Sequence, residues 1–143
     1  MPHEPNIYQC DFDLQRVILS MGEEYDFQIV GESFHQDHLE DVAGGKNEEQ
    51  CDLIKSAILM MDSSNPNDPM AIAVFVDNGH VGYVPGYACV QMRSELAAIV
   101  KDRRPVFCAA KIVGGWDRGN GDEGSYGVRL NIARPLSILN ESA

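Results

Sequence analysis

Short apolar runs separated by turn residues recur along the chain from residue 26 onward. β-branched and aromatic side chains are frequent in these runs, and each run is about as long as an ordinary strand. The pattern predicts strands at residues 26–34, 55–62, 71–77, 80–85, 105–113 and 125–132. Asn78-Gly79, which lies between the third and fourth runs, is the strongest short signal for a β-hairpin.

Two further segments carry apolar residues at helical spacing. Leu39 and Val42 stand three residues apart and a Gly-Gly pair ends their segment, which is typical of a short helix. Apolar residues also fall at roughly helical intervals across 88–100, before the charged stretch KDRRP ends the helix. About six strands with two short helices predict a mainly β, β-rich α+β fold, either a small barrel or a compact sheet.

The predicted strands and helices define one domain at residues 26–134. Before it, residues 1–25 mix acidic with isolated apolar residues, and only 14–21 suggest a short helix or strand. We interpret residues 1–25 as an N-terminal extension and residues 135–143, which carry little pattern, as a C-terminal tail. A chain of 143 residues is long enough for one domain with its own core.

The sequence shows no signal for a membrane or for export. No apolar run approaches the roughly 20 residues of a membrane-spanning helix, and the first residues have neither the basic start nor the apolar stretch of a secretion signal. We expect a soluble, cytoplasmic protein with no membrane partner. Its four cysteines are irregularly spaced and form no CxxC pair, which predicts buried, reduced thiols.

Motifs for catalysis are absent from the sequence. There is no P-loop, no nucleophile elbow around a serine and no motif that pairs a cysteine with a histidine. His35, Asp37 and His38 have side chains that can ligate metals, but no recognised ligand spacing is present. We therefore expect no enzymatic activity, no metal and no cofactor.

The net charge of −11 argues against simple binding of a polyanion, because lysine and arginine supply most non-specific affinity for nucleic acids. The charge is unevenly spread. Residues 1–92 hold 3 basic against 16 acidic side chains, a net −13, whereas 93–134 hold 8 basic against 5 acidic ones, a net +3. Either the charges are scattered and solvated in the folded protein, or the C-terminal part forms a local basic patch on an acidic molecule.

A stiff turn, Asn-Pro-Asn-Asp-Pro at residues 65–69, precedes the apolar run that starts at residue 71. Each proline fixes its own backbone and restricts the residue before it, so the turn has few alternative conformations. Asp68 lies at its apex. Its carboxylate either accepts hydrogen bonds from N–H groups of the turn or points outward as an acceptor for a ligand hydroxyl. Trp116, among neighbouring glycines, is either a core anchor or an exposed stacking surface.

Four of these segments, in this order, resemble the HIRAN domain: IVGESF, NPNDPMAIAVF, HVGYVP and the helix that follows. This family occurs as an appendage of SNF2-type DNA translocases and as a free-standing bacterial protein. The resemblance covers about residues 27–132. It implies an OB-like β-barrel that captures the 3′-hydroxyl end of single-stranded DNA, and OB folds bind single strands by stacking bases on aromatic rings over a basic groove.

The resemblance assigns roles to individual residues. Asp68 matches the acidic residue that receives the terminal 3′-hydroxyl. Phe34 matches an aromatic residue after the glycine of the first strand, and Tyr126 matches a base-stacking aromatic near the last strand.

Three positions differ from the family pattern. Ser33 stands where the DNA-binding member has an arginine, Asn67 where it has a tyrosine, and Gly86 where it has a lysine. Two charges and one stacking ring are therefore missing, and we expect weak binding that falls as the salt concentration rises.

Two classes of function follow: a module that binds single-stranded DNA ends, or a protein-interaction module with an acidic surface. The candidate DNA-binding residues are Ser33, Phe34, His35, Asn67, Asp68, Tyr83, Tyr126, Arg118 and Arg129. The positions of Arg118, Arg129 and Lys111 discriminate between the classes. If these basic residues cluster beside the aromatic rings, they favour nucleic acid, and if they are dispersed, they favour a protein partner.

Overall fold

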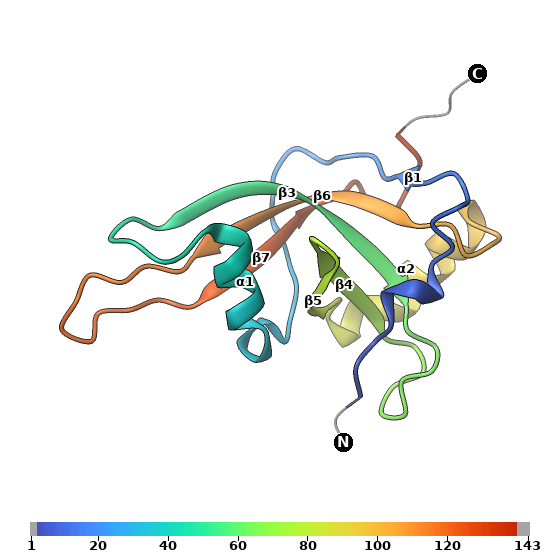
Figure 1. The fold of residues 1–143 in the computed structure, drawn as a ribbon. Helices are drawn as coiled ribbons and strands as arrows, with labels where there is room; N and C mark the ends of the chain where they lie inside the picture. The colour runs from blue at the N-terminus through green and yellow to red at the C-terminus, as the bar shows by residue number, and fades with distance from the viewer. Residues whose placement is uncertain (1–2, 140–143) are drawn as a thin grey trace.

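In the computed structural model, which describes residues 3–139, one curled sheet forms the centre of the fold (Figure 1). Its strands are β1 (Val17–Ile18), β2 (Phe27–Gln28), β3 (Cys51–Met61), β4 (Ile72–Val76), β5 (Gly79–Tyr83), β6 (Val106–Gly114) and β7 (Tyr126–Asn131). The helices are α1 (Gln36–Ala43) and α2 (Gly86–Ile99), with 3₁₀ turns η1 (Ile7–Gln9) and η2 (Glu32–Phe34). The prediction of a mainly β, OB-like fold with two helices is confirmed.

The sheet has the antiparallel order β2-β7-β6-β3-β4-β5, and β1 pairs in parallel with β6. A single bridge joins the two ends of this path. The backbone N–H of Val30 donates to the carbonyl of Tyr83 at 2.9 Å, and the N–H of Tyr83 donates to the carbonyl of Val30 at 2.8 Å. Gly82 makes this approach possible, because a Cβ there would lie 2.4 Å from the Val30 carbonyl oxygen.

The segment predicted as a strand at 26–34 is a strand only at Phe27–Gln28, followed by the single bridge at Val30. Gly31 takes a left-handed conformation, with φ 85°, and the chain then turns into η2. Glycine adopts this conformation without the steric cost of a Cβ. The turn η2 lies against both β5 and β7.

The β4–β5 hairpin forms as predicted, but its turn lies one residue earlier. Asp77 and Asn78 have positive φ values of 48° and 64°, so they are the two central residues, as in a type I′ turn. Gly79 instead begins β5, where a Cβ would lie 2.2 Å from Nε2 of His38. The glycine is therefore needed for the packing of α1 against the hairpin.

Residues from both the N-terminal extension and the C-terminal tail take part in the packing of the domain. Val17 and Leu19 lie in the main core, and Leu136 joins them there. Ile7 and Cys10 form a second apolar cluster on the other face of the sheet, with Phe75 of β4 among their partners. Because the N-terminal segment covers this face, all five residues of β4 are buried.

Beyond the barrel, the β6–β7 connection projects as a long arm beside the segment that leads into β3 (Figure 1). We define the arm as residues 44–52 and 114–125. Trp116 lies in it half-buried rather than in the core, and its Nε1–H donates to Oδ1 of Asp122 at 3.1 Å. Within residues 3–139, no helix has the length and apolar character that crossing a membrane requires.

Candidate binding groove

The outer face of β5 brings several predicted residues together. The rings of His35 and His80 lie 4.3 Å apart between centroids, and those of His80 and Tyr83 lie 4.7 Å apart. The Tyr83 hydroxyl lies 3.5 Å from Nδ2 of Asn65, in the stiff turn. We name His3, His35, Asp62, Asn65, His80 and Tyr83 the hairpin cluster. A cleft of about 390 Å³ opens beside it, between residues 4–8, the start of α1 and the hairpin.

Side chains of the turn itself hold its conformation. Oδ1 of Asn65 accepts from the N–H of Asn67 at 2.9 Å and of Asp68 at 3.3 Å. Oδ1 of Asp68 accepts from the N–H of Met70 at 2.9 Å, so the carboxylate does cap the turn. Arg93 of α2 donates to the carbonyl of Met70 at 2.7 Å and fixes the turn from the other side. Asp68 is exposed, and its second oxygen makes no hydrogen bond within residues 3–139.

Asp62, which the sequence pattern did not single out, is the buried centre of the hairpin cluster. Its side chain is 0% exposed. Oδ2 accepts from Nε2 of His3 at 2.8 Å and from the hydroxyl of Tyr83 at 3.4 Å, whereas Oδ1 has no partner in the described part of the chain. A buried carboxylate needs such donors, because burying an unpaired charge is costly. A charged residue at the end of the apolar run 55–62 was the available signal.

Burial keeps His80 and Tyr83 neutral at physiological pH. Desolvation, with a further contribution from the charge of His35, lowers the pKa of His80 to about 4. Its Nε2–H donates to the carbonyl of Gly82 at 2.9 Å. Desolvation and the carboxylate of Asp62 raise the pKa of Tyr83 to about 12. These two rings of β5 therefore offer neutral donors and acceptors rather than positive charge.

Exposed aromatic side chains lie close to the hairpin cluster. Phe34 is 86% exposed, and the hydrogen bond from its N–H to the carbonyl of Gly31 at 3.2 Å holds it next to the Val30–Tyr83 bridge. Ser33 lies in the same 3₁₀ turn, and Asn67 is exposed in the stiff turn. We use the name groove for the surface that runs from η2 across the hairpin cluster to Asp68 and that includes the cleft beside His35 and His80.

Three predicted residues lie outside the groove. Tyr126 is 3% exposed and packs under the backbone of Gly115, so its ring does not offer a stacking surface. Arg118 lies in the arm, where its guanidinium covers the ring of Trp116. Arg129 is exposed on β7, beside Lys111 of β6.

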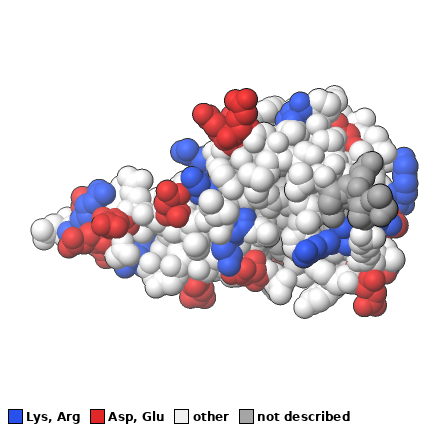
Figure 2. Space-filling view, turned by 90° about the horizontal axis from the view of Figure 1, so that it is seen from above, with Lys and Arg blue, Asp and Glu red and all other residues white. Residues whose placement is uncertain are grey.

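Lys111 and Arg129 are neighbours across β6 and β7, and Arg118 lies in the arm, so these basic side chains are dispersed with respect to the rings of the groove. Figure 2 shows Lys and Arg interspersed with Asp and Glu on the face it displays, including the tapering arm. No group of three or more His, Cys, Asp or Glu side chains within residues 3–139 is arranged to hold a metal ion. The groove thus has rings, hydrogen-bonding groups and one exposed carboxylate, but few cations.

Comparisons with protein-family models, with curated proteins and with solved structures give no match. The resemblance to the HIRAN domain accordingly stays a prediction. The ligand of the groove is therefore inferred from the geometry and chemistry of the groove itself.

Proposed function

We propose that this protein is a HIRAN-like binding module that holds the 3′ end of a single DNA strand in the groove beside β5. The observation that carries the proposal is the convergence of two loops far apart in sequence on β5: the ring of His35 contacts that of His80, and Asn65 reaches the hydroxyl of Tyr83. Binding sites in proteins are commonly formed where separate short segments of the chain meet in this way.

Phe34 and Asp68 supply the two contacts for the end of the DNA strand: a ring for base stacking and an acceptor for the terminal hydroxyl. Stacking a base on an aromatic ring contributes about 1–3 kcal/mol, and the exposed ring of Phe34 is free to take that role. The oxygen of Asp68 that does not cap the turn accepts a hydrogen bond from a terminal hydroxyl. A charge-assisted hydrogen bond of this kind contributes about 1.5–3 kcal/mol.

The affinity should be low and sensitive to salt. The net charge is −11, and Arg93, the cation that contacts the stiff turn, already donates to the carbonyls of Met70 and Ala71. Without several phosphate contacts, we expect dissociation constants near the non-specific range of about 10⁻⁶–10⁻⁴ M.

Fluorescence anisotropy with labelled single strands tests the proposal. At low salt, strands that end in a 3′-hydroxyl should bind more tightly than strands that end in a 3′-phosphate, because the carboxylate of Asp68 repels a phosphate. Asp68→Ala should weaken binding of the hydroxyl-ended strand roughly 10- to 100-fold and reduce this preference. Phe34→Ala should weaken both strands equally, and Arg118→Ala, in the arm, serves as the control that leaves both unchanged.

Two results would overturn the proposal. One is that neither strand binds at low salt, and the other is that Asp68→Ala keeps the full preference for the 3′-hydroxyl end over the 3′-phosphate end.

A protein partner is the second candidate, and the dispersal of Arg118, Arg129 and Lys111 favours it. The acidic first part of the chain, with a net charge of −13 over residues 1–92, would meet a basic partner. This alternative predicts binding of a lysine-rich peptide at low salt, with no binding of oligonucleotides.

The four cysteines are free, which fits a reducing compartment, and we propose that the module is cytoplasmic.

A further inference from the structure

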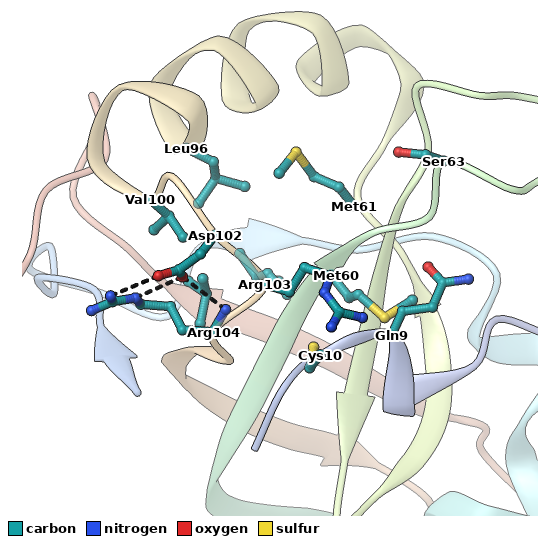
Figure 3. A pocket seen from close by; sticks show the side chains of 12 residues that line it. Gln9, Cys10, Met60, Met61, Ser63, Leu96, Val100, Asp102, Arg103 and Arg104 are labelled. Carbon is teal, nitrogen blue, oxygen red and sulfur yellow. Dashed lines mark hydrogen bonds and ion pairs between the residues drawn. The ribbon is translucent and has the colours of Figure 1, made fainter. Parts of the chain in front are cut away.

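An apolar pocket of about 370 Å³ lies where the end of α2 and the loop after it meet β3 and η1 (Figure 3). Its apolar lining is Leu59, Met60, Met61, Leu96, Val100 and Val106. Leu59 and Leu96 belong to the main core, whereas Met60 and Cys10 belong to the second apolar cluster on the other face of the sheet. The pocket therefore lies at the edge of β3, beyond its last pair with β6, where side chains of both faces border it. Pockets of this size and composition are typical small-molecule sites, and methionine side chains adapt to different apolar shapes.

The N-terminal segment forms one wall of this pocket through Gln9 and Cys10. The N–H of Asp11 donates to the carbonyl of Arg103 at 2.7 Å, which joins this segment to the loop after α2. Nε2 of Gln9 donates to Oγ of Ser64 at 3.0 Å and joins it to the loop after β3. The wall is therefore held at two points, and the pocket is a defined part of the fold.

Two neighbouring arginines at the pocket differ in their partners. Arg104 binds Asp102 through two hydrogen bonds of 2.8 Å, and this pairing lowers the pKa of the Asp102 carboxyl to about 2. The side chain of Arg103 is exposed and makes no hydrogen bond or ion pair within residues 3–139. Figure 3 draws the guanidinium of Arg103 near Met60 and Cys10, with dashed lines only between Asp102 and Arg104.

We propose that this pocket binds a small amphipathic carboxylate, with its apolar chain against Met60, Met61 and Leu96 and its carboxylate on Arg103. A guanidinium presents paired N–H donors that match a carboxylate in a bidentate arrangement. An uncharged apolar ligand would leave this cation unused, and a short anion such as acetate would leave the apolar walls uncovered. The site is separate from the groove and does not depend on the function proposed there.

Isothermal titration of the full chain with decanoate, below its micelle concentration, tests the proposal. Decan-1-ol fills the same apolar space without the charge, and acetate carries the charge without the chain. We expect decanoate to bind, decanol to bind roughly 10- to 100-fold more weakly, and acetate to give no measurable heat. Equal affinity for decanoate and decanol, or no binding of decanoate, overturns the proposal.

A matched pair of variants tests whether Arg103 is the cation that binds the carboxylate. Arg103→Gln should reduce the affinity for decanoate by roughly 10-fold or more and leave that for decanol unchanged. Arg129→Gln removes another exposed arginine, on β7, whose side chain makes no hydrogen bond or ion pair within residues 3–139, and it should leave both affinities unchanged. An equal loss in the two variants would mean that decanoate responds only to net charge, which contradicts the proposal.

Methyl NMR of the methionines locates the apolar chain. Decanoate should shift the signals of Met60 and Met61, which line the pocket, and not those of the exposed Met21 and Met70. Shifts at the exposed methionines without shifts at Met60 and Met61 would place the ligand elsewhere and overturn the assignment.

Discussion

The hairpin cluster and the arm are both rich in polar side chains, yet they use them in opposite ways. In the cluster, the carboxylate of Asp62 is fully buried and its partners come from residues 3, 65 and 83. In the arm, Arg118 and Asp122 form an exposed ion pair at 3.9 Å between residues four apart. The cluster depends on buried polar contacts, whereas the charged side chains of the arm, including Arg118 with the carbonyl of Glu48, make their contacts at the exposed surface.

This difference shows why charge along the sequence is a poor guide to the site. Exposed ion pairs contribute about 0–1 kcal/mol, because solvent screens them. Buried polar groups must find partners, and burial changes their pKa, as it does for His80 and Tyr83. The residues that fix the geometry of the groove are therefore those whose polar groups are buried, and the arginines of the C-terminal part of the chain are not among them.

The largest effect should come from breaking the bridge that supports the cluster. Gly82→Ala places a Cβ 2.4 Å from the carbonyl oxygen of Val30, and this backbone atom cannot move without opening the bridge. We expect a loss of about 1–3 kcal/mol in the free energy of unfolding, measured by urea titration. Gly86→Ala at the start of α2 meets no atom within 4 Å and requires no positive φ, so it is the control. An equal or greater loss at Gly86 would contradict the importance of the bridge.

The pH dependence of stability should distinguish the two regions next. Because the pKa of His80 is lowered to about 4 in the folded protein, the unfolded chain binds more protons between pH 4 and about 6.5. Stability should be complete above this window and fall as the pH drops through it. After discounting for the half-exposed ring, we expect about 1–2 kcal/mol.

Urea unfolding at pH 7 and pH 5 measures this change. His80→Phe should remove most of the difference between the two values, and the arm variant Glu123→Gln should retain it. An undiminished difference in His80→Phe would assign the pH dependence to other groups.

A smaller effect is expected in the stiff turn. Asp68→Ala removes the acceptor for the N–H of Met70 and should cost about 0.5–1 kcal/mol of unfolding free energy. Asp68→Asn keeps an oxygen at the same position and should recover most of this loss. If the alanine variant is as stable as the unchanged protein, the carboxylate does not hold the turn.

The smallest effect should be found in the arm. Arg118→Ala removes an exposed ion pair, a hydrogen bond of 3.1 Å to the carbonyl of Glu48 and a contact with the ring of Trp116. Because all three are exposed to solvent, we expect a change within about 0.5 kcal/mol. Thermal unfolding of this variant beside Gly82→Ala gives the comparison directly. A loss above 1 kcal/mol would show that the arm also supports the fold.

Local sequence patterns predict those parts of the fold that depend on neighbouring residues. The helix that ends at Gly44, the strand at 72–76 and the stiff turn before it all form as expected. Each depends on short-range chemistry: a left-handed glycine, a continuous apolar run, or proline and asparagine in a turn. The hairpin was also predicted, with an error of one residue because Gly79 is needed beneath His38.

Contacts between distant segments could not be predicted in this way. Val17 pairs in parallel with Val106, and Val30 forms a bridge with Tyr83. No local sequence pattern indicates either pairing. The burial of Asp62 follows from the same contacts, since its partner His3 arrives with the N-terminal segment. Tyr126 is buried for a similar reason, because the two glycines at 114 and 115 let its ring pack beneath the arm.

Amide NMR of the protein, titrated with a short single strand that ends in a 3′-hydroxyl, tests the central claim most directly. If the binding site lies in the groove, the amide signals of Phe34, Asp68 and Tyr83 should shift together and saturate with one dissociation constant. Those of Arg118 and Trp116 in the arm should stay in place. Shifts confined to the arm or to the surface around Arg129, or no shifts at any concentration, would contradict the account.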